Sequence, residues 1–506
     1  MNRSSNHLSF AALIIGLICA RSAMAGLPSS PPQVDSEPKK AAPTPRDLGE
    51  QVQPAAKLRE DLHILRRALE EGHSGVYRYT PKADLDRQFD QAERALDRPM
   101  NVYEFYRVVA PAVAAVKCGH TGVRVPPMVS QQKPRLPLSV RVLDGKVFVL
   151  RDLSSKGTLA GLEIRSVNGT PAAQLVKTML AATSGDGDVQ TARMYRIGRL
   201  TFANNLVDLL GLESPYTVTF WDARARRETS VRLEGQEESK LREAARAKFP
   251  QDEPAKESAQ LSFLDDGKVA FLKVRRFGGR ADAAGKKDLR TFFPEAFSEI
   301  DKKKAGALIL DLRDNGGGAD ELGKLLLSFL IDRPFKYYDD LVINALKFSF
   351  QKYTNFPNGF PARLNELVER QPNGKYRMVK HPNWGTQQPS KPAFAGPVYI
   401  LINGGSFSTT SEFLSHVHAR KRATFIGAES AGGYYGNTSG PGVLLTLPNT
   451  KLQAYVPLMT YYMAVRDYKA ANHGVVPDFP VAYTIDELLA GKDKELALAL
   501  ELVHKQ

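Results

Sequence analysis

The stretch that decides the fold is residues 307–318, which read Ala-Leu-Ile-Leu-Asp-Leu-Arg-Asp-Asn-Gly-Gly-Gly. The first half, up to Leu312, is mostly apolar, which predicts a strand buried on both faces. Three successive glycines follow, and such a turn lets backbone N–H groups point into a cavity without obstruction from side chains. The Lys-Ser or Lys-Thr ending of a phosphate-binding loop is missing, so the pattern does not indicate nucleotide binding.

Strands and helices alternate on both sides of this stretch. Further strands are predicted at 269–274, 398–402 and 423–427, and helices at 289–300, at 320–331 and after Ser406. This alternation predicts a parallel α/β core within residues 258–490. Residues 336–390 are polar and contain prolines, which indicates an insertion or a covering lobe.

Two different patterns precede the core. Leucines recur at helical spacing in the first of them, at Leu58, Leu62, Leu65 and Leu69. Two more helical segments follow, so residues 57–125 are predicted to form a small helical domain. Residues 130–235 then show alternating apolar residues and the turn pairs Asp144-Gly145 and Asn168-Gly169, which predict a small β-rich module.

The N-terminus resembles an export signal. A mostly apolar run of about a dozen residues ends near Cys19, and Ala23-Met24-Ala25 offers a cleavage site, so residues 1–25 are predicted to be a signal peptide. Residues 26–56 are rich in proline and read as an extended linker. A periplasmic or secreted protein is therefore expected.

Composition excludes several classes of protein. Of the 506 residues, 42% are hydrophobic and 25% are charged, as in ordinary globular proteins. Cleavage after Ala25 would remove two arginines and Cys19, which lowers the formal charge from +14 to +12 and leaves Cys118 as the one cysteine. An internal disulfide and a multi-cysteine zinc module are then excluded. The basic residues are scattered, which does not favour nucleic acid as a partner, and no cofactor or metal is indicated.

Residues 403–412, Asn-Gly-Gly-Ser-Phe-Ser-Thr-Thr-Ser-Glu, are the strongest candidate for chemistry. A buried strand ends just before them and a helix is predicted to begin near Ser408. A serine there lies at the positive end of the helix dipole, where an oxyanion is stabilised. The competing interpretation is structural, because serine and threonine are also the preferred helix N-caps.

Residues 118–121, Cys-Gly-His-Thr, are a second candidate. His120 follows a predicted helix and can act as a general base. Cys118 is a weaker candidate nucleophile because no helix N-terminus follows it.

Three linked motifs resemble the S41 serine peptidases, the tail-specific or carboxyl-terminal processing protease family. They are residues 307–318, residues 404–413 with the later strand at 422–427, and Gly474-Val475-Val476-Pro477-Asp478. The resemblance extends over about residues 58–490. It implies a ClpP-like or crotonase-like spiral catalytic core, and it makes the β-rich module a PDZ-like domain. It also implies that Ser408 is the nucleophile and that the N–H groups of Gly316 or Gly317, with that of Thr409, form the oxyanion hole.

The sequence departs from the processing proteases at an important position. Their Ser/Lys dyad needs a lysine where this chain has Gly433. The pattern instead resembles the lysine-lacking, tricorn-like branch of the family, whose catalytic members use a histidine at the position of His120. The orienting residues of that branch are replaced here by Gly119 and Ala471, so the third member of a triad is unassigned.

These observations predict an exported serine endopeptidase in which His120 activates Ser408 and an acyl-enzyme is hydrolysed by water. The substrates would be proteins or peptides. Two alternatives remain open: a non-catalytic peptide- or ligand-binding protein with the same fold, and Lys451 as a base supplied from another strand. A crotonase-type acyl-CoA enzyme is disfavoured because an exported protein does not meet CoA pools.

Overall fold

The computed structural model describes residues 44–252, 257–278, 288–360 and 362–505. The predicted signal peptide and most of the predicted linker lie outside these residues. The end of the linker does not remain extended, because Thr44 caps a short helix, α2 (Pro45–Glu50), through a capping box with Asp47. No helix in the described part of the chain is long and apolar enough to cross a membrane.

A six-stranded sheet built around residues 307–311 forms the core. Its order is β20-β17-β16-β10-β9-β8, and all neighbouring strands are parallel except β8, which is antiparallel to β9. The strands are β8 (Ala259–Leu264), β9 (Val269–Val274), β10 (Ala307–Asp311), β16 (Val398–Ile402), β17 (Thr424–Gly427) and β20 (Phe479–Pro480). Every residue of β10 and β16 is buried, as their apolar runs predict.

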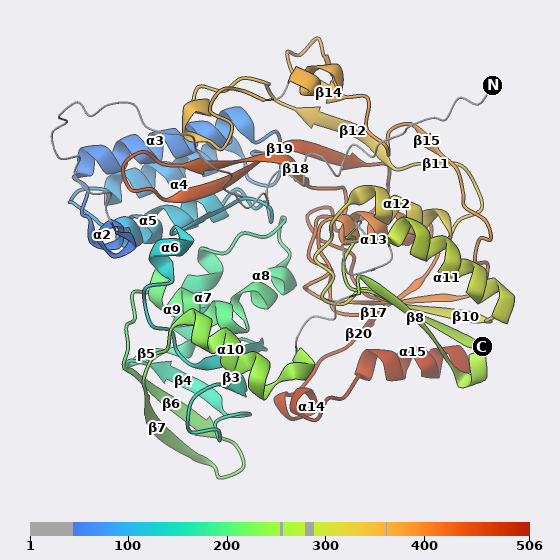
Figure 1. The fold of residues 1–506 in the computed structure, drawn as a ribbon, viewed down its shortest axis with the longest axis horizontal. Helices are drawn as coiled ribbons and strands as arrows, with labels where there is room; N and C mark the ends of the chain where they lie inside the picture. Colours follow the sequence, from blue (N-terminus) through green and yellow to red (C-terminus); the bar gives the residue numbers. More distant parts are fainter. Residues whose placement is uncertain (1–43, 253–256, 279–287, 361, 506) are drawn as a thin grey trace, which may run out of the picture.

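Helices cover both faces of this sheet (Figure 1). Leu308 and Leu310 pack with α11 (Leu289–Lys303), α12 (Asp320–Ser328) and α13 (Thr409–Ala419), whereas Ile309 faces the C-terminal helix α15 (Lys494–His504). The short helix α14 (Ile485–Leu489) precedes α15. The carboxyl ends of β10 and β16 therefore meet the N-termini of α12 and α13 at one edge.

A second sheet joins the core to the N-terminal helices. The long hairpin of β18 (Thr438–Thr446) and β19 (Gln453–Met463) pairs with β1 (Gly122–Arg124) and β12 (Tyr338–Ile343), and β14 (Tyr376–Met378) and β13 (Val368–Arg370) extend it. Residues 336–390 therefore contribute strands to this sheet. The remaining short elements there are β11 (Phe335–Lys336), which pairs with β15 (Thr386–Gln387), and the 3-10 turns Gln351–Tyr353 and Ala362–Glu366.

The predicted N-terminal helices are present as α3 (Ala55–Gly72), α4 (Lys82–Ala95) and α5 (Val102–Ala114), followed by the single turn α6 (Pro127–Ser130). Their apolar side chains share one core with the β18–β19 hairpin, as Leu62, Val113, Leu445 and Val456 illustrate. His120 lies between α5 and β1, so this packing sets its position relative to the core.

The third sheet follows the predicted β-rich pattern. Its order is β2-β3-β4-β6-β7, with β5 on β4. The strands are β2 (Leu138–Leu143), β3 (Lys146–Asp152), β4 (Glu163–Val167), β5 (Thr170–Pro171), β6 (Tyr216–Asp222) and β7 (Arg227–Leu233). Both residues of each predicted turn pair, Asp144-Gly145 and Asn168-Gly169, have positive φ, as tight hairpin turns require.

The same region contains helices that the sequence did not indicate. They are α7 (Ala172–Ala181), α8 (Gln190–Ile197) and α9 (Leu200–Asp208), and none of them has a side-chain N-cap. The charge-rich connector forms α10 (Glu238–Lys248) and a 3-10 turn at Pro250–Asp252. A similar turn, Asp265–Gly267, links β8 to β9.

Candidate active site

Ser408 lies at the turn between β16 and α13 in a conformation that an ordinary helix cap does not have. Its φ and ψ are 57° and −127°, and its side chain makes no capping hydrogen bond to the helix. A positive φ is strained for any residue with a side chain, and such strain concentrates at functional sites. The structural interpretation of Ser408 as an N-cap is therefore not supported, and its hydroxyl is available for another partner.

That partner is His120. Its Nε2 atom lies 3.0 Å from Ser408 Oγ. One face of the imidazole packs on the Phe407 ring with centroids 4.4 Å apart, and the Arg196 guanidinium lies 4.7 Å from the centroid of the Phe407 ring. Arg196 also donates to the carbonyl oxygen of Gly119 at 2.8 Å. The base and the nucleophile predicted from the sequence are thus brought into hydrogen-bonding contact.

The surroundings of His120 favour the neutral imidazole. Burial lowers its pKa to about 4, an effect that the nearby Asp186 carboxylate opposes and the Arg196 charge reinforces. Its Nδ1 atom is enclosed and has no hydrogen-bond partner among the described residues. At neutral pH the ring can therefore accept a proton from Ser408.

The glycine turn approaches Ser408 closely. Gly317 has φ of 98°, and a Cβ atom placed on it would lie 2.6 Å from Ser408 Cβ, so no larger residue fits there. Two hydrogen bonds tie the turn to the nucleophile segment. The backbone carbonyl oxygen of Asn315 accepts from the N–H of Phe407 at 3.0 Å and from the Thr410 hydroxyl at 3.0 Å.

The N–H groups predicted to form the oxyanion hole differ in availability. The N–H of Gly317 donates to Asn315 Oδ1 at 2.9 Å. By contrast, the N–H groups of Gly316 and Thr409 have no hydrogen-bond acceptor among the described residues. The backbone thus leaves Gly316 and Thr409 free to donate, whereas Gly317 would first have to release Asn315.

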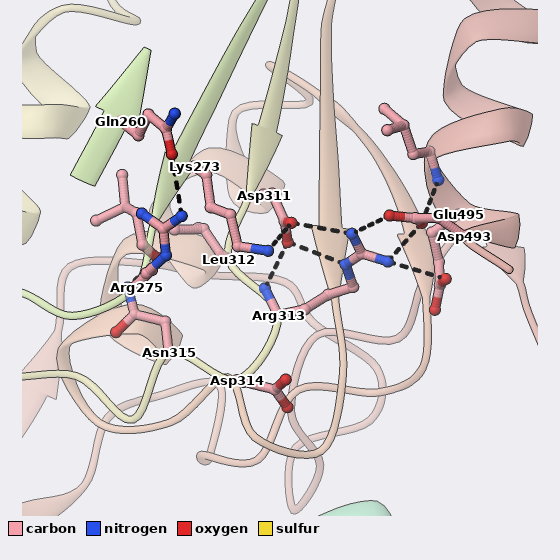
Figure 2. Close-up of polar contacts among 12 residues, drawn as sticks. Gln260, Lys273, Arg275, Asp311, Leu312, Arg313, Asp314, Asn315, Asp493 and Glu495 are labelled. Carbon is pink, nitrogen blue, oxygen red and sulfur yellow. Dashed lines mark hydrogen bonds and ion pairs between the residues drawn. The ribbon is translucent and has the colours of Figure 1, made fainter. Parts of the chain in front are cut away.

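The charged residues of the 307–318 stretch have a structural role. Asp311 accepts from Lys273 and from both ends of the Arg313 guanidinium, and Arg313 also reaches Asp493 and Glu495 beside α15 (Figure 2). Burial alone would raise the pKa of Asp311, but its two cationic partners outweigh this effect and hold the pKa below its usual value. This network anchors the end of β10, from which the glycine turn starts.

Two hollows meet at His120. One, of about 190 Å³, is lined by Ser408, Thr409 and Gly318, by apolar residues and by the carboxylates of Asp320 and Glu412. Its apolar walls include Leu367, Met378, Met459 and Tyr461. The other, of about 530 Å³, lies between β1 and the helices α8 and α9, and it is lined by Arg124, Arg196 and Asn205 among others. Both hollows reach His120, and the smaller one is also lined by Ser408.

One tyrosine hydroxyl bridges the two carboxylates of the smaller hollow. Tyr338 Oη lies 2.7 Å from Asp320 Oδ2 and 2.9 Å from Glu412 Oε2, and His381 Nε2 lies 3.2 Å from the same Asp320 oxygen. A hydroxyl has one proton to donate, so the second contact requires a protonated carboxyl group. Burial and the Asp320 charge raise the pKa of Glu412 to about 7, which identifies Glu412 as the protonated partner.

The positions where the sequence departs from the processing proteases have physical reasons. A Cβ atom on Gly433 would lie 2.1 Å from the hydroxyl of Tyr79, so Tyr79 fills the space that a lysine side chain would need. A Cβ atom on Gly119 would lie 2.8 Å from the Phe407 ring.

Lys451, the alternative base, is exposed on the β18–β19 hairpin, where it donates to the carbonyl oxygen of Pro448. It lines neither hollow at His120.

Cys118 is packed away from the nucleophile. Its Sγ donates to the carbonyl oxygen of Thr438 at 3.3 Å, and burial raises the pKa of its thiol to about 11. Ligand atoms of Cys118, His120 and Asp186 lie within 4.8 Å of one another. A neutral buried thiol is a poor metal ligand, because binding requires the thiolate.

Asp186 is the residue of this site that sequence reasoning missed. It is 1% exposed, it accepts from the N–H of Gly119 at 2.6 Å, and it accepts from the N–H of Gly433 at 3.1 Å. Its sequence context, Ser-Gly-Asp-Gly-Asp at 184–188, looks like a surface turn. The sequence therefore predicts an exposed side chain for Asp186 and does not indicate that its carboxylate is buried beside His120.

Comparison with known proteins agrees with this architecture. Residues 268–481 match the family model for peptidase family S41. Among solved structures, mature CPAF is similar with a TM-score of 0.58 and 17% identity, covering 86% of this chain and 94% of that chain. Mature CPAF complexed with lactacystin gives a TM-score of 0.61 and 16% identity, covering 89% and 97%. No curated protein sequence matches the chain.

A third solved structure, the photosystem II D1 C-terminal processing protease, aligns with a TM-score of 0.38 and 15% identity over 84% of this chain and 93% of that chain. The likeness to CPAF shows that the mixed α/β fold is shared over most of the chain. The family match covers all strands of the core sheet except β8, together with the glycine turn and the Ser408 segment. Residues 268–481 thus match peptidase family S41, and this match supports a serine peptidase that acts on protein or peptide substrates.

Proposed function

We propose that this protein is an exported serine endopeptidase in which Ser408 is the nucleophile and His120 is its general base. The observation that carries the proposal is the 3.0 Å contact between His120 Nε2 and Ser408 Oγ. The strained backbone of Ser408 and its lack of a capping hydrogen bond add support.

The proposed reaction has two halves. His120 Nε2 takes the hydroxyl proton as Ser408 Oγ attacks the scissile carbonyl carbon, and the imidazolium then gives this proton to the leaving amine. In the second half, His120 takes a proton from water, hydroxide attacks the acyl-enzyme, and the proton returns to Ser408 Oγ as the acid product leaves.

The negative oxygen of each tetrahedral intermediate would be stabilised by backbone donors. The N–H of Thr409 at the start of α13 and the N–H of Gly316 are the available donors, and the helix dipole adds to their effect. Gly317 becomes a third donor if Asn315 releases it.

The remaining parts of the chain have proposed roles that follow from the resemblance and from the sequence patterns. Residues 258–490 would form a ClpP-like or crotonase-like catalytic core, and residues 130–235 would form a PDZ-like module that recognises the substrate chain. Residues 57–125 would form a helical domain that carries the His120 segment to the core. Residues 1–25 would direct export to the periplasm or the medium.

The proposal is tested with purified protein from residue 26 onward, an unstructured protein such as casein, and a fluorophosphonate probe. Ser408→Ala and His120→Ala should each abolish hydrolysis and probe labelling. Their melting temperatures should remain close to that of the wild type. Ser349→Ala, an exposed serine that bonds Glu71, is the matched control and should retain both. Unchanged hydrolysis by Ser408→Ala would refute the nucleophile assignment.

The alternative of a non-catalytic binding protein has one structural observation in its favour. The N–H of Gly317, which would face an oxyanion, is occupied by Asn315 in this structure. A wild-type protein that binds peptides, hydrolyses none of them and resists the probe would establish this alternative.

A further inference from the structure

We propose that Asp186 positions His120 and stabilises its protonated form during the reaction. The inference rests on the proposed function, because it assigns the group that supports His120 when His120 acts as a base. It also fills the position for which the sequence offered no candidate, since Gly119 and Ala471 have no polar side chain.

The carboxylate of Asp186 is held beside the imidazole by backbone donors. One oxygen accepts from the N–H of Gly119, the residue before His120, and the other accepts from the N–H of Gly433. A carboxylate oxygen of Asp186 lies within 4.8 Å of a His120 ring nitrogen. His120 Nε2 contacts Ser408, so Nδ1 is the ring nitrogen that has no hydrogen-bond partner among the described residues.

The loop that carries Asp186 is fastened to the segment that carries His120. The N–H of Gly187 donates to the carbonyl oxygen of Lys117 at 3.0 Å. Arg196 donates to Ser184 and to Gly119, each at 2.8 Å. These contacts fix the distance between the carboxylate and the imidazole.

The charges around His120 make a counter-ion necessary. When Nε2 takes the proton of Ser408, a positive ring forms with its Nδ1 atom enclosed and without a partner. Three other titratable neighbours do not compensate this charge: Arg196 is a cation, the Cys118 thiol is neutral, and burial holds the pKa of His73 at about 3, so that His73 is neutral too. Asp320 and Glu412 line the same hollow as His120, but Asp320 is paired with His381, and burial raises the pKa of Glu412 to about 7. Asp186 supplies the opposite charge in a poorly solvated site, where a charge acts strongly.

A purely structural role for Asp186 makes a different prediction. If the carboxylate only ties two loops together, its replacement lowers stability and leaves the acidity of His120 unchanged. If it supports the imidazolium, its replacement lowers the pKa of His120, because a negative neighbour raises the pKa of a histidine.

The experiment compares Asp186→Asn, Asp186→Glu and the control Asp188→Asn in the full mature chain. Asp188 lies in the same loop, but its side chain is 42% exposed and pairs with Lys117. For Asp186→Asn we expect kcat/KM to fall roughly a hundredfold, as loss of one buried charge interaction implies. The acid limb of its pH–rate profile should move to lower pH. Asp186→Glu should recover part of the activity, and Asp188→Asn should stay within about threefold of the wild type.

Each outcome has a defined meaning. Wild-type kcat/KM in Asp186→Asn, or a loss of activity without movement of the acid limb, would overturn the role of Asp186. Failure of Asp186→Asn to fold while Asp188→Asn folds would assign Asp186 to loop structure and would also overturn it. Retained hydrolysis by Ser408→Ala, in contrast, would refute the proposed function itself, so the two failures are distinguishable.

Discussion

Ser408 Oγ and His120 Nε2 lie 3.0 Å apart although the two residues are 288 positions apart in the chain. Ser408 is presented by the parallel sheet, at the turn between β16 and α13. His120 is presented by the segment between α5 and β1, and β1 pairs with β19 through Gly122 and Tyr455. The contact therefore depends on the β18–β19 hairpin, which packs with the N-terminal helices and belongs to the same sheet as β12.

The low pKa of His120 predicts activity at mildly acidic pH. Because burial lowers that pKa to about 4, the ring remains neutral and basic at pH 5.5, where an ordinary histidine with a pKa near 6.5 is mostly protonated. The value of kcat/KM should therefore stay nearly constant from pH 7.5 down to pH 5.5 and fall only below that. An acid limb centred at pH 6.5 or above would contradict the enclosed position of His120.

Gly119 is predicted to be irreplaceable by serine for a steric reason. A Cβ atom there would meet the Phe407 ring at 2.8 Å, and the ring packs directly on His120. Gly119→Ser should therefore lower stability by about 1–3 kcal/mol, the usual cost of overpacking, and should reduce kcat more than it raises KM. Gly122→Ala is the stability control, because its Cβ atom would meet nothing within 4 Å. Equal melting temperatures for the two variants would argue against the predicted clash.

Arg313 is predicted to matter for stability rather than for chemistry. Arg313→Met would leave the fully buried Asp311 with Lys273 as its remaining cation, and it would remove the guanidinium that Asp493 and Glu495 share. Removal of one partner from a buried ion network costs about 3–5 kcal/mol. Urea denaturation should show this loss. Arg46→Ala, which breaks an exposed pair with Glu50, should leave the denaturation midpoint nearly unchanged.

The parts of the fold that were predictable are those with strong local patterns. The fully apolar runs of β10 and β16 identified the parallel core, and the two positive-φ turn pairs identified hairpins of the third sheet. The helices α7, α8 and α9 were missed because none begins with a capping side chain. Residues 336–390 appeared to be an insertion because the pairing of β12 with β19 spans more than a hundred residues and leaves no local signal.

The candidate site divides in the same way. Ser408 follows the apolar strand β16, and His120 follows the amphipathic helix α5. Both also carry a reactive side chain, so the sequence was sufficient to identify them as candidates. Asp186 could not be nominated, because its partners Gly119 and Gly433 are 67 and 247 positions away and contact it through their backbone N–H groups. Because nearly every residue has a backbone N–H, the residue types in a sequence do not show which of these groups will donate to a carboxylate.

Glu412 provides a prediction about pH and stability. In the folded protein, Asn437 Nδ2 donates to Glu412 Oε1 at 2.8 Å, and the protonated Oε2 donates to the Tyr338 hydroxyl. Glutamine reproduces this pattern, since its oxygen accepts from Asn437 and its amide donates to Tyr338. We expect Glu412→Gln to fold normally and to become progressively more stable than the wild type as the pH rises from 5 to 8.

The sign follows from the raised pKa. The folded protein holds the Glu412 proton up to a pH of about 7, whereas the unfolded chain releases it near the ordinary value of about 4.5. Between these values the unfolded state binds fewer protons, so the stability of the wild type declines as the pH rises, and the decline levels off above pH 7. Glu412→Gln lacks this titration, and its free energy of unfolding should exceed that of the wild type at pH 8 by about 3 kcal/mol. Urea denaturation at pH 5, 6.5 and 8 measures the difference, with Glu243→Gln on the exposed side of α10 as the control. A difference that stays constant over this range would show that Glu412 is ionised in the folded protein.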